Sequence, residues 1–169
     1  MSKKNGPETN IKLKAGVIVR WRKKVLLIRE LNNRTGFYRW NIIKGTFEPD
    51  KDRDIQATAI REAKEEAKAS IVLKSLLGIY HLHDGDDVLT MFTFIADLKK
   101  KEFGVRQKNE QTTFRKGEDI NEVRLFSLNE LKSLRQNDFV GLRGYLAIQD
   151  YLNKKGVPLT LLTTLPKKK

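Results

Sequence analysis

The sequence has no cysteine, only two histidines and only four prolines among its 169 residues. Without cysteine there is no disulfide framework, no thiolate zinc site and no thiol nucleophile, so oxygen atoms or His81 and His83 must hold any metal. The chain also lacks an apolar run long enough to span a membrane, and its basic first residues are not followed by the apolar segment of a secretory signal. We therefore expect a cytoplasmic protein with no membrane partner.

No internal repeat and no linker rich in proline, glycine or serine divides the chain. Hydrophobic residues make up 39% of it, which is enough for the core of one domain of this length. Both ends are rich in lysine. We expect residues 1–12 to be a basic disordered tail, residues 13–163 a single domain and residues 164–169 a lysine-rich tail.

Positive charge is in large excess, with 34 lysines and arginines against 21 acids and a net charge of +13. Apart from the two ends, the excess is concentrated in residues 99–117, which hold seven basic and two acidic residues. Such a segment favours a phosphorylated small molecule as partner, and Lys108, Arg115 and Lys116 are candidate substrate-binding residues. A nucleic acid is less favoured, because no RNA-binding motif with interleaved aromatic residues is present. Alternatively, the segment is a basic surface loop that only aids solubility.

Hydrophobic periodicity predicts an alternation of strands and helices. The predicted strands are residues 13–19 and 24–29, which form a hairpin, and residues 71–80, 88–98 and 123–126. The predicted helices are residues 55–69, a segment from the capping box at Ser127 and Glu130 to about residue 134, and a segment from about residue 138 to 154. Residues 81–87 are expected to form a turn. This order predicts an α/β fold with a mixed sheet between helices.

The helix predicted at residues 55–69 carries three carboxylates within one turn. Glu62, Glu65 and Glu66 stand at positions i, i+3 and i+4, so they lie on one side of the helix. Three carboxylates on one face suit a hard cation such as Mg²⁺ or Mn²⁺. The alternative is a solvated surface helix, since Arg61 and Lys64 interleave positive charge.

A known family pattern is visible around this helix. Residues 45–49 (GTFEP) and 61–66 (REAKEE), with Trp40 five residues before the glycine, resemble the Nudix box, G-x5-E-x7-R-E-U-x-E-E-x-G-U, where U is a bulky aliphatic residue. Residues 122–131 resemble the family's late strand and serine-started helix, and residues 145–159 are similar to the ending of a small bacterial phosphatase-like Nudix branch. The resemblance implies an α/β/α sandwich with a mixed sheet. It also implies metal-dependent hydrolysis of phosphoanhydride bonds in nucleoside diphosphate-linked or related pyrophosphate substrates.

The resemblance also implies roles for single residues. Glu62 and Glu66 would be the main metal ligands, with Glu65 completing the site and the main-chain carbonyl of Lys44 as a further ligand. Arg61 would orient the glutamates through ion pairs.

The general base is either a glutamate of the box, with Glu65 as the candidate, or an acid of a later loop. The later acids are Glu110, Glu118, Asp119 and Glu122, and Glu118 is preferred because it precedes a strand beside the basic segment. Trp40 is a candidate for stacking on a substrate base, unless it belongs to the core.

The chain departs from the Nudix pattern at several positions. Directly before the box glycine the family usually has Pro-Gly, whereas this chain has Ile43 and Lys44. Within the box, Lys51 stands at the first glutamate and Lys68 replaces the closing glycine. Between Gly45 and Arg61 lie 15 residues where the pattern has 13, so we expect a bulge at residues 50–54. A side chain at Lys44 should oppose left-handed backbone angles there. These departures keep open a second interpretation, a catalytically degenerate module that binds nucleotide or RNA.

Overall fold

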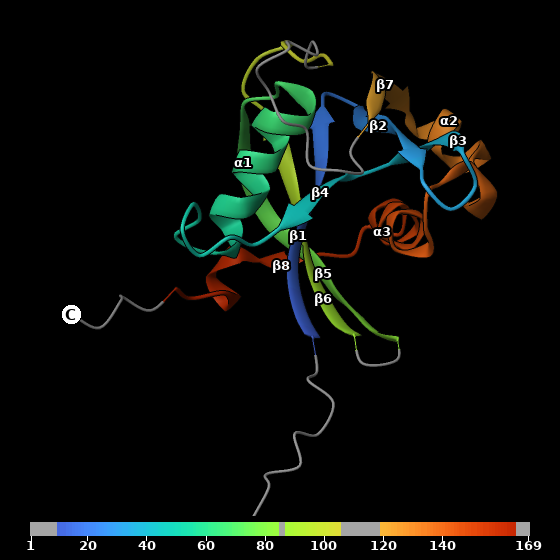
Figure 1. The fold of residues 1–169 in the computed structure, drawn as a ribbon. Helices are drawn as coiled ribbons and strands as arrows, with labels where there is room; N and C mark the ends of the chain where they lie inside the picture. Colours follow the sequence, from blue (N-terminus) through green and yellow to red (C-terminus); the bar gives the residue numbers. More distant parts are fainter. Residues whose placement is uncertain (1–9, 85–86, 106–118, 165–169) are drawn as a thin grey trace, which may run out of the picture.

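The computed structural model describes residues 10–84, 87–105 and 119–164 (Figure 1). Within them the main elements follow in this order: β1 (Asn10–Trp21), β2 (Lys24–Asn32), β3 (Phe37–Asn41), β4 (Ile43–Thr46), α1 (Ile55–Ala67), β5 (Ile71–Asp84), β6 (Asp87–Leu98), β7 (Ile120–Ser127), α2 (Leu128–Ser133), α3 (Leu142–Leu152) and β8 (Val157–Pro158). Short 3₁₀ turns at Gln136–Asp138 and Leu159–Leu161 complete the described chain.

The strands form one mixed sheet that branches at β1. The strand order is β3-β2-β1-β6-β5-β8, while β4 pairs with β1 and β7 pairs with β2. On one edge β1 runs parallel to β6 from Asn10 to Arg20. Its other edge is shared, since residues 14–17 pair antiparallel with β4 and residues 19–21 pair antiparallel with β2. This sharing places β4, which contains Gly45, in the centre of the fold.

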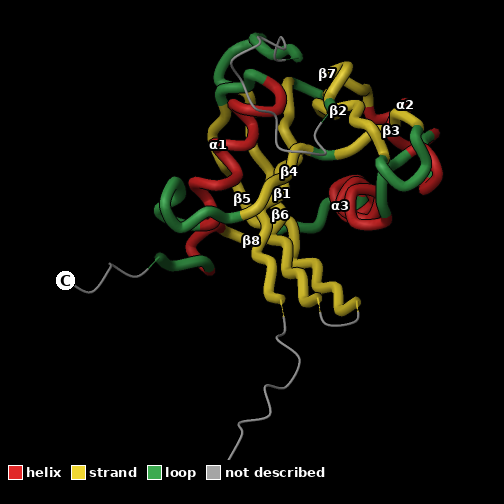
Figure 2. The backbone as a smooth tube through the Cα atoms, in the orientation of Figure 1, coloured by secondary structure: helices red, strands yellow, loops and turns green. Residues whose placement is uncertain are grey.

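Helices cover both faces of the sheet (Figures 1 and 2). Neighbouring residues of one strand point to opposite faces, so Val17 packs with α1 in one core and Ile18 packs with α2 and α3 in the other. Ile43 and Ile42 divide between the two cores in the same way. The expected α/β/α sandwich with a mixed sheet is confirmed.

Several elements agree closely with their local sequence signals. Helix α1 begins at Ile55, as predicted, because the side chain of Asp54 accepts a hydrogen bond of 2.8 Å from the amide of Ala57. The capping box of Ser127 and Glu130 begins α2 with both of its hydrogen bonds formed. The hairpin predicted near residues 13–29 is also present, with longer strands than expected.

Other elements differ from the prediction because long-range pairing decided them. Strand β1 begins at Asn10, so residues 10–12, expected in the tail, pair with β6, and Lys12 bonds Asp87 at 3.0 Å. The bounds of the turn expected at residues 81–87 are wrong, because β5 continues to Asp84 and β6 begins at Asp87. The last helix begins at Leu142, after a 3₁₀ turn at Gln136–Asp138. In the part of the chain that the structure describes, no helix is long and apolar enough to cross a membrane.

Candidate metal and catalytic site

Strand β4 and helix α1 touch at a glycine. A Cβ atom built on Gly45 would lie 1.8 Å from Cδ of Glu62 and 1.9 Å from its Oε1, so only a glycine leaves room for this carboxylate. Gly45 does not have a positive φ, so the requirement is one of space. The two halves of the pattern, far apart in sequence, therefore meet at Gly45 and Glu62.

Glu62 and Glu66 point inward from α1 and are only 2% and 5% exposed. Glu66 Oε2 accepts a 3.0 Å hydrogen bond from the main-chain amide of Lys44, while its Oε1 is buried without a hydrogen-bond partner. Burial raises the pKa of Glu66, and repulsion by Glu30 and Glu62 adds to the rise, whereas the positive charge of Lys44 opposes it. A buried carboxylate with an unused oxygen fits a hard cation as ligand.

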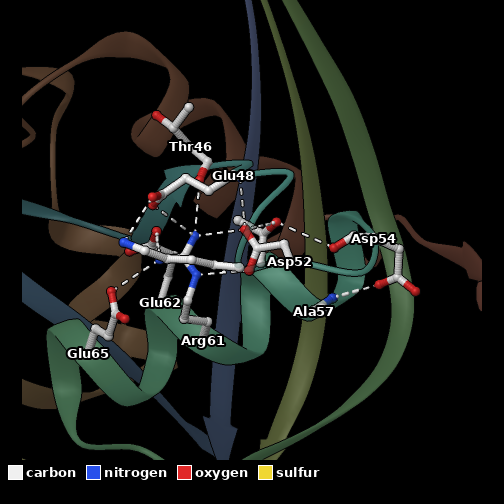
Figure 3. A network of polar contacts seen from close by, with 10 residues as sticks. Thr46, Glu48, Asp52, Asp54, Ala57, Arg61, Glu62 and Glu65 are labelled. Carbon is white, nitrogen blue, oxygen red and sulfur yellow. Dashed lines mark hydrogen bonds and ion pairs between the residues drawn. The ribbon is translucent and has the colours of Figure 1, made fainter.

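Arg61 lies between two sets of carboxylates (Figure 3). Its Nε and Nη2 bond the two oxygens of Asp52 at 2.8 and 2.9 Å, and its Nη1 bonds Glu62 at 2.6 Å and Glu65 at 3.1 Å. Nη2 also donates to the carbonyl of Thr46 at 3.0 Å. The paired guanidinium lowers the pKa of Asp52, and the bond to Asp52 raises the pKa of Arg61. Arg61 thereby holds Glu62 in place through the same Oε1 atom that approaches Gly45.

Asp52 is a site residue that the sequence analysis missed. The first acid of the pattern was placed at Lys51, but this lysine is exposed and pairs with Glu48 at 2.9 Å. The buried acid against Arg61 stands one residue later, and it also accepts from the Glu48 amide and the Thr58 hydroxyl, both at 3.0 Å. The segment before α1 thus supplies, at Asp52, the acid that the pattern places at position 51. The only sequence signal for Asp52 was that an acid stands directly beside that position.

Glu65 does not join Glu62 and Glu66 on their buried side. Its side chain is 45% exposed, and it accepts a 3.1 Å hydrogen bond from Arg61. Among residues 10–84, 87–105 and 119–164, no group of three acids or histidines lies together as a metal-binding cluster. The structure brings two of the three predicted carboxylates together, along with the main chain of Lys44.

The side chain of Lys44 enters the same site. Its Nζ contacts both oxygens of Glu30, at 2.8 and 3.0 Å, and Glu30 also accepts from Asn41 Nδ2 at 2.7 Å. Glu30 is the one acid of β2 and is buried, and it belongs to no motif that could have identified it from the sequence. The expected cost of left-handed angles at Lys44 is wrong, since Lys44 belongs to strand β4. It is Lys68, at the end of α1, that is left-handed, with φ of 50° and ψ of 24°.

Trp40 lies away from the carboxylates. Its ring packs edge-on against Phe126, with centroids 4.7 Å apart, in the core that α2 and α3 cover. The guanidinium groups of Arg29 and Arg124 flank this ring at 5.8 and 5.7 Å. This position corresponds to a place in the core, which was the alternative to stacking on a substrate base.

The remaining predicted residues divide into two groups. Outside the described residues lie Lys108, Glu110, Arg115, Lys116 and Glu118. Of the other acids considered as base, Asp119 accepts from the Tyr38 hydroxyl at 3.0 Å, and Glu122 pairs with Arg29 at 3.6 Å. His81 and His83 are exposed on β5.

Comparison with known proteins gives a consistent family. A family model described as "NUDIX domain" matches residues 11–146. Similar solved structures include a NUDIX hydrolase from Nitrosomonas europaea, with 23% identity, 91% of this chain and 97% of that chain covered, and a TM-score of 0.69. Another is the NUDIX domain of Shewanella oneidensis NrtR complexed with ADP ribose. It has 12% identity, covers 91% of this chain and 93% of its own, and has a TM-score of 0.61.

A third similar structure is an ADP-ribose pyrophosphatase from Streptococcus suis, with 18% identity, coverage of 83% and 90%, and a TM-score of 0.54. A sequence search of the curated proteins found no match.

Proposed function

Because this chain belongs to the NUDIX domain family, whose members are generally metal-dependent pyrophosphohydrolases, we propose that it hydrolyses phosphoanhydride bonds in nucleoside diphosphate-linked substrates, using Mg²⁺ or Mn²⁺. The observation that carries the proposal is the buried pair Glu62 and Glu66. Glu62 lies against Gly45, and Glu66 accepts from the Lys44 amide with one oxygen while its Oε1 has no hydrogen-bond partner in the described part of the chain. Such a pair is costly to bury unless a cation compensates its charge. In keeping with the absence of cysteine, we place the protein in the cytoplasm.

Glu62, Glu66 and the main-chain carbonyl of Lys44 would hold the divalent ion. Carboxylate and carbonyl oxygens are the ligands that Mg²⁺ and Mn²⁺ prefer. When bound, the ion supplies positive charge to the phosphoanhydride and favours ionisation of a water molecule. These oxygen donors are therefore suited to this chemistry. The other side chains of the site would position the ligands, bind the substrate phosphates or accept a proton from the attacking water.

Arg61 and Asp52 act as positioning residues. Asp52 is almost fully buried and holds the guanidinium of Arg61 through two bonds, and Arg61 in turn fixes Glu62. Glu65, half-exposed and bonded to Arg61 at 3.1 Å, is one candidate for the general base. Glu118, which the sequence favours, is the other.

Positive side chains near the site would bind the phosphates of the substrate. Arg39 is opposite Glu30 in the pairing of β2 with β3, and its Nε is buried with no hydrogen-bond partner in the described part of the chain. A guanidinium with an unused donor suits a phosphate oxygen. Lys108, Arg115 and Lys116 would add charge from the basic segment. The two similar structures whose descriptions mention ADP-ribose make ADP-ribose a sensible first substrate to test.

The decisive experiment separates and quantifies the products formed with Mg²⁺ or Mn²⁺ from three substrates. Water added across one phosphoanhydride gives AMP and ribose 5-phosphate from ADP-ribose, a nucleoside monophosphate and pyrophosphate from a nucleoside triphosphate, and two nucleotides from a dinucleoside polyphosphate. Glu66→Gln should lower kcat by roughly a thousandfold or more, because an amide is a poor ligand for a hard cation. Asp87→Asn, which changes a half-exposed acid of β6 paired with Lys12 at 3.0 Å, is the control for loss of one carboxylate and should keep wild-type activity. Hydrolysis that persists in Glu66→Gln and in excess EDTA would place the chemistry elsewhere.

The second candidate function is a module that binds nucleotide without turning it over. The ammonium of Lys44 among the buried carboxylates is the observation that favours it, since this charge competes with a metal ion. In that case wild type would bind ADP-ribose in calorimetry but release no product with any of the three substrates.

A further inference from the structure

Lys44 connects two buried carboxylates of the site. Its main-chain amide donates to Glu66 at 3.0 Å, and its side-chain ammonium bonds both oxygens of Glu30. The side chain of Lys44 is only 20% exposed and that of Glu30 only 6%. The ammonium is therefore a fixed charge of the site rather than a mobile surface charge.

The charge balance of the buried groups explains why this matters. Five carboxylates are buried around α1 and β4, and one of them, Asp54, caps α1 and is balanced by Arg53 at 3.0 Å. The other four are Glu30, Asp52, Glu62 and Glu66. The cations among them are Arg61 and Lys44, so an excess of two negative charges is left. One divalent ion neutralises this excess. Without Lys44 the excess would be three, and Glu30 would lose its only ion pair in the described part of the chain, with the hydrogen bond from Asn41 still on one oxygen and the other oxygen open to a cation.

We propose that the Lys44 ammonium occupies the position of a second divalent ion, so that this chain binds a single metal ion, at Glu62 and Glu66. The inference rests on the proposed metal site and specifies its stoichiometry. A lysine stands directly before the box glycine, where the family usually has a glycine, which cannot supply a charge. The ammonium satisfies Glu30 with a single positive charge and leaves Glu66 Oε1 as the unused oxygen for the ion.

The test counts Mn²⁺ ions bound to the full chain, by calorimetry and by the electron paramagnetic resonance of free Mn²⁺. Wild type should bind one ion, and Lys44→Met should gain a second, with an affinity at least about tenfold above any second binding to wild type, because a like charge has been removed. Lys44→Arg, which keeps the charge, should stay at one ion. Lys132→Met, an exposed lysine of α2, is the control for loss of one positive charge.

A double variant assigns the second ion. Glu30→Gln combined with Lys44→Met should return to one ion, because the carboxylate that the ammonium had occupied is gone. Two tightly bound ions in wild type would overturn the inference and leave the proposed function intact, and this count decides the matter even if Lys44→Met does not fold. Unchanged binding in a folded Lys44→Met would also overturn it. A wild type and a Lys44→Met that both bind no Mn²⁺ would instead refute the proposed metal site.

Discussion

Gly45→Ala tests the contact on which the site depends. The added Cβ would lie 1.8 Å from Cδ of Glu62, so this carboxyl group would have to move by about 1.5 Å to restore an ordinary contact between carbon atoms. Glu62 has nowhere to go without loss, because it is buried and bonded to Arg61 at 2.6 Å. Overpacking of this kind costs about 1–3 kcal/mol, and the weakened charged hydrogen bond adds to the cost.

We expect Gly45→Ala to lower the free energy of unfolding by about 2–4 kcal/mol, which corresponds to a fall in Tm of roughly 5–15 °C for a domain of this size. Thermal unfolding without metal measures this loss of stability. Calorimetric titration should show that Gly45→Ala also binds Mn²⁺ more weakly than wild type. Gly104→Ala is the matched control, since no atom lies within 4 Å of the Cβ built there. Equal Tm and equal Mn²⁺ affinity in the two variants would refute the close approach of β4 and α1.

Three further predictions follow from single residues. Lys68→Gly should raise the free energy of unfolding by about 1 kcal/mol, measured by denaturant titration, because a left-handed backbone costs a side chain about that much. Asp52→Asn should lower it by about 3 kcal/mol or more, since Arg61 loses its buried partner. Because the pKa of Asp52 is lowered from 3.8, its stabilisation is complete above that pH and is lost as the pH falls through the folded pKa, so wild type and Asp52→Asn should converge in acid unfolding. Arg39→Met should raise KM for ADP-ribose several-fold with little change in kcat, in steady-state assays.

Local signals account for the elements that carry the site. The aspartate cap at Asp54 and the apolar spacing of residues 55–67 define α1 without help from the rest of the chain. The spacing of Glu62 and Glu66 by one helical turn also follows from the sequence, and both are buried as that spacing allows. These features depend on residues a few positions apart, so their pattern is visible in one dimension.

The other features of the site depend on segments that are distant in the sequence and adjacent in the fold. Glu65 shares the helical spacing, yet its side chain is 45% exposed, because the elements packed against α1 cover the side of Glu62 and Glu66. Lys44 and Glu30 are 14 residues apart. Their charges come into contact only because β2 pairs with β3, which continues into β4 through the single residue Ile42. The helix and its carboxylates were thus determined by local sequence, whereas the partners of those carboxylates were decided by tertiary structure, because side chains that meet across strands depend on register and on burial that no local pattern encodes.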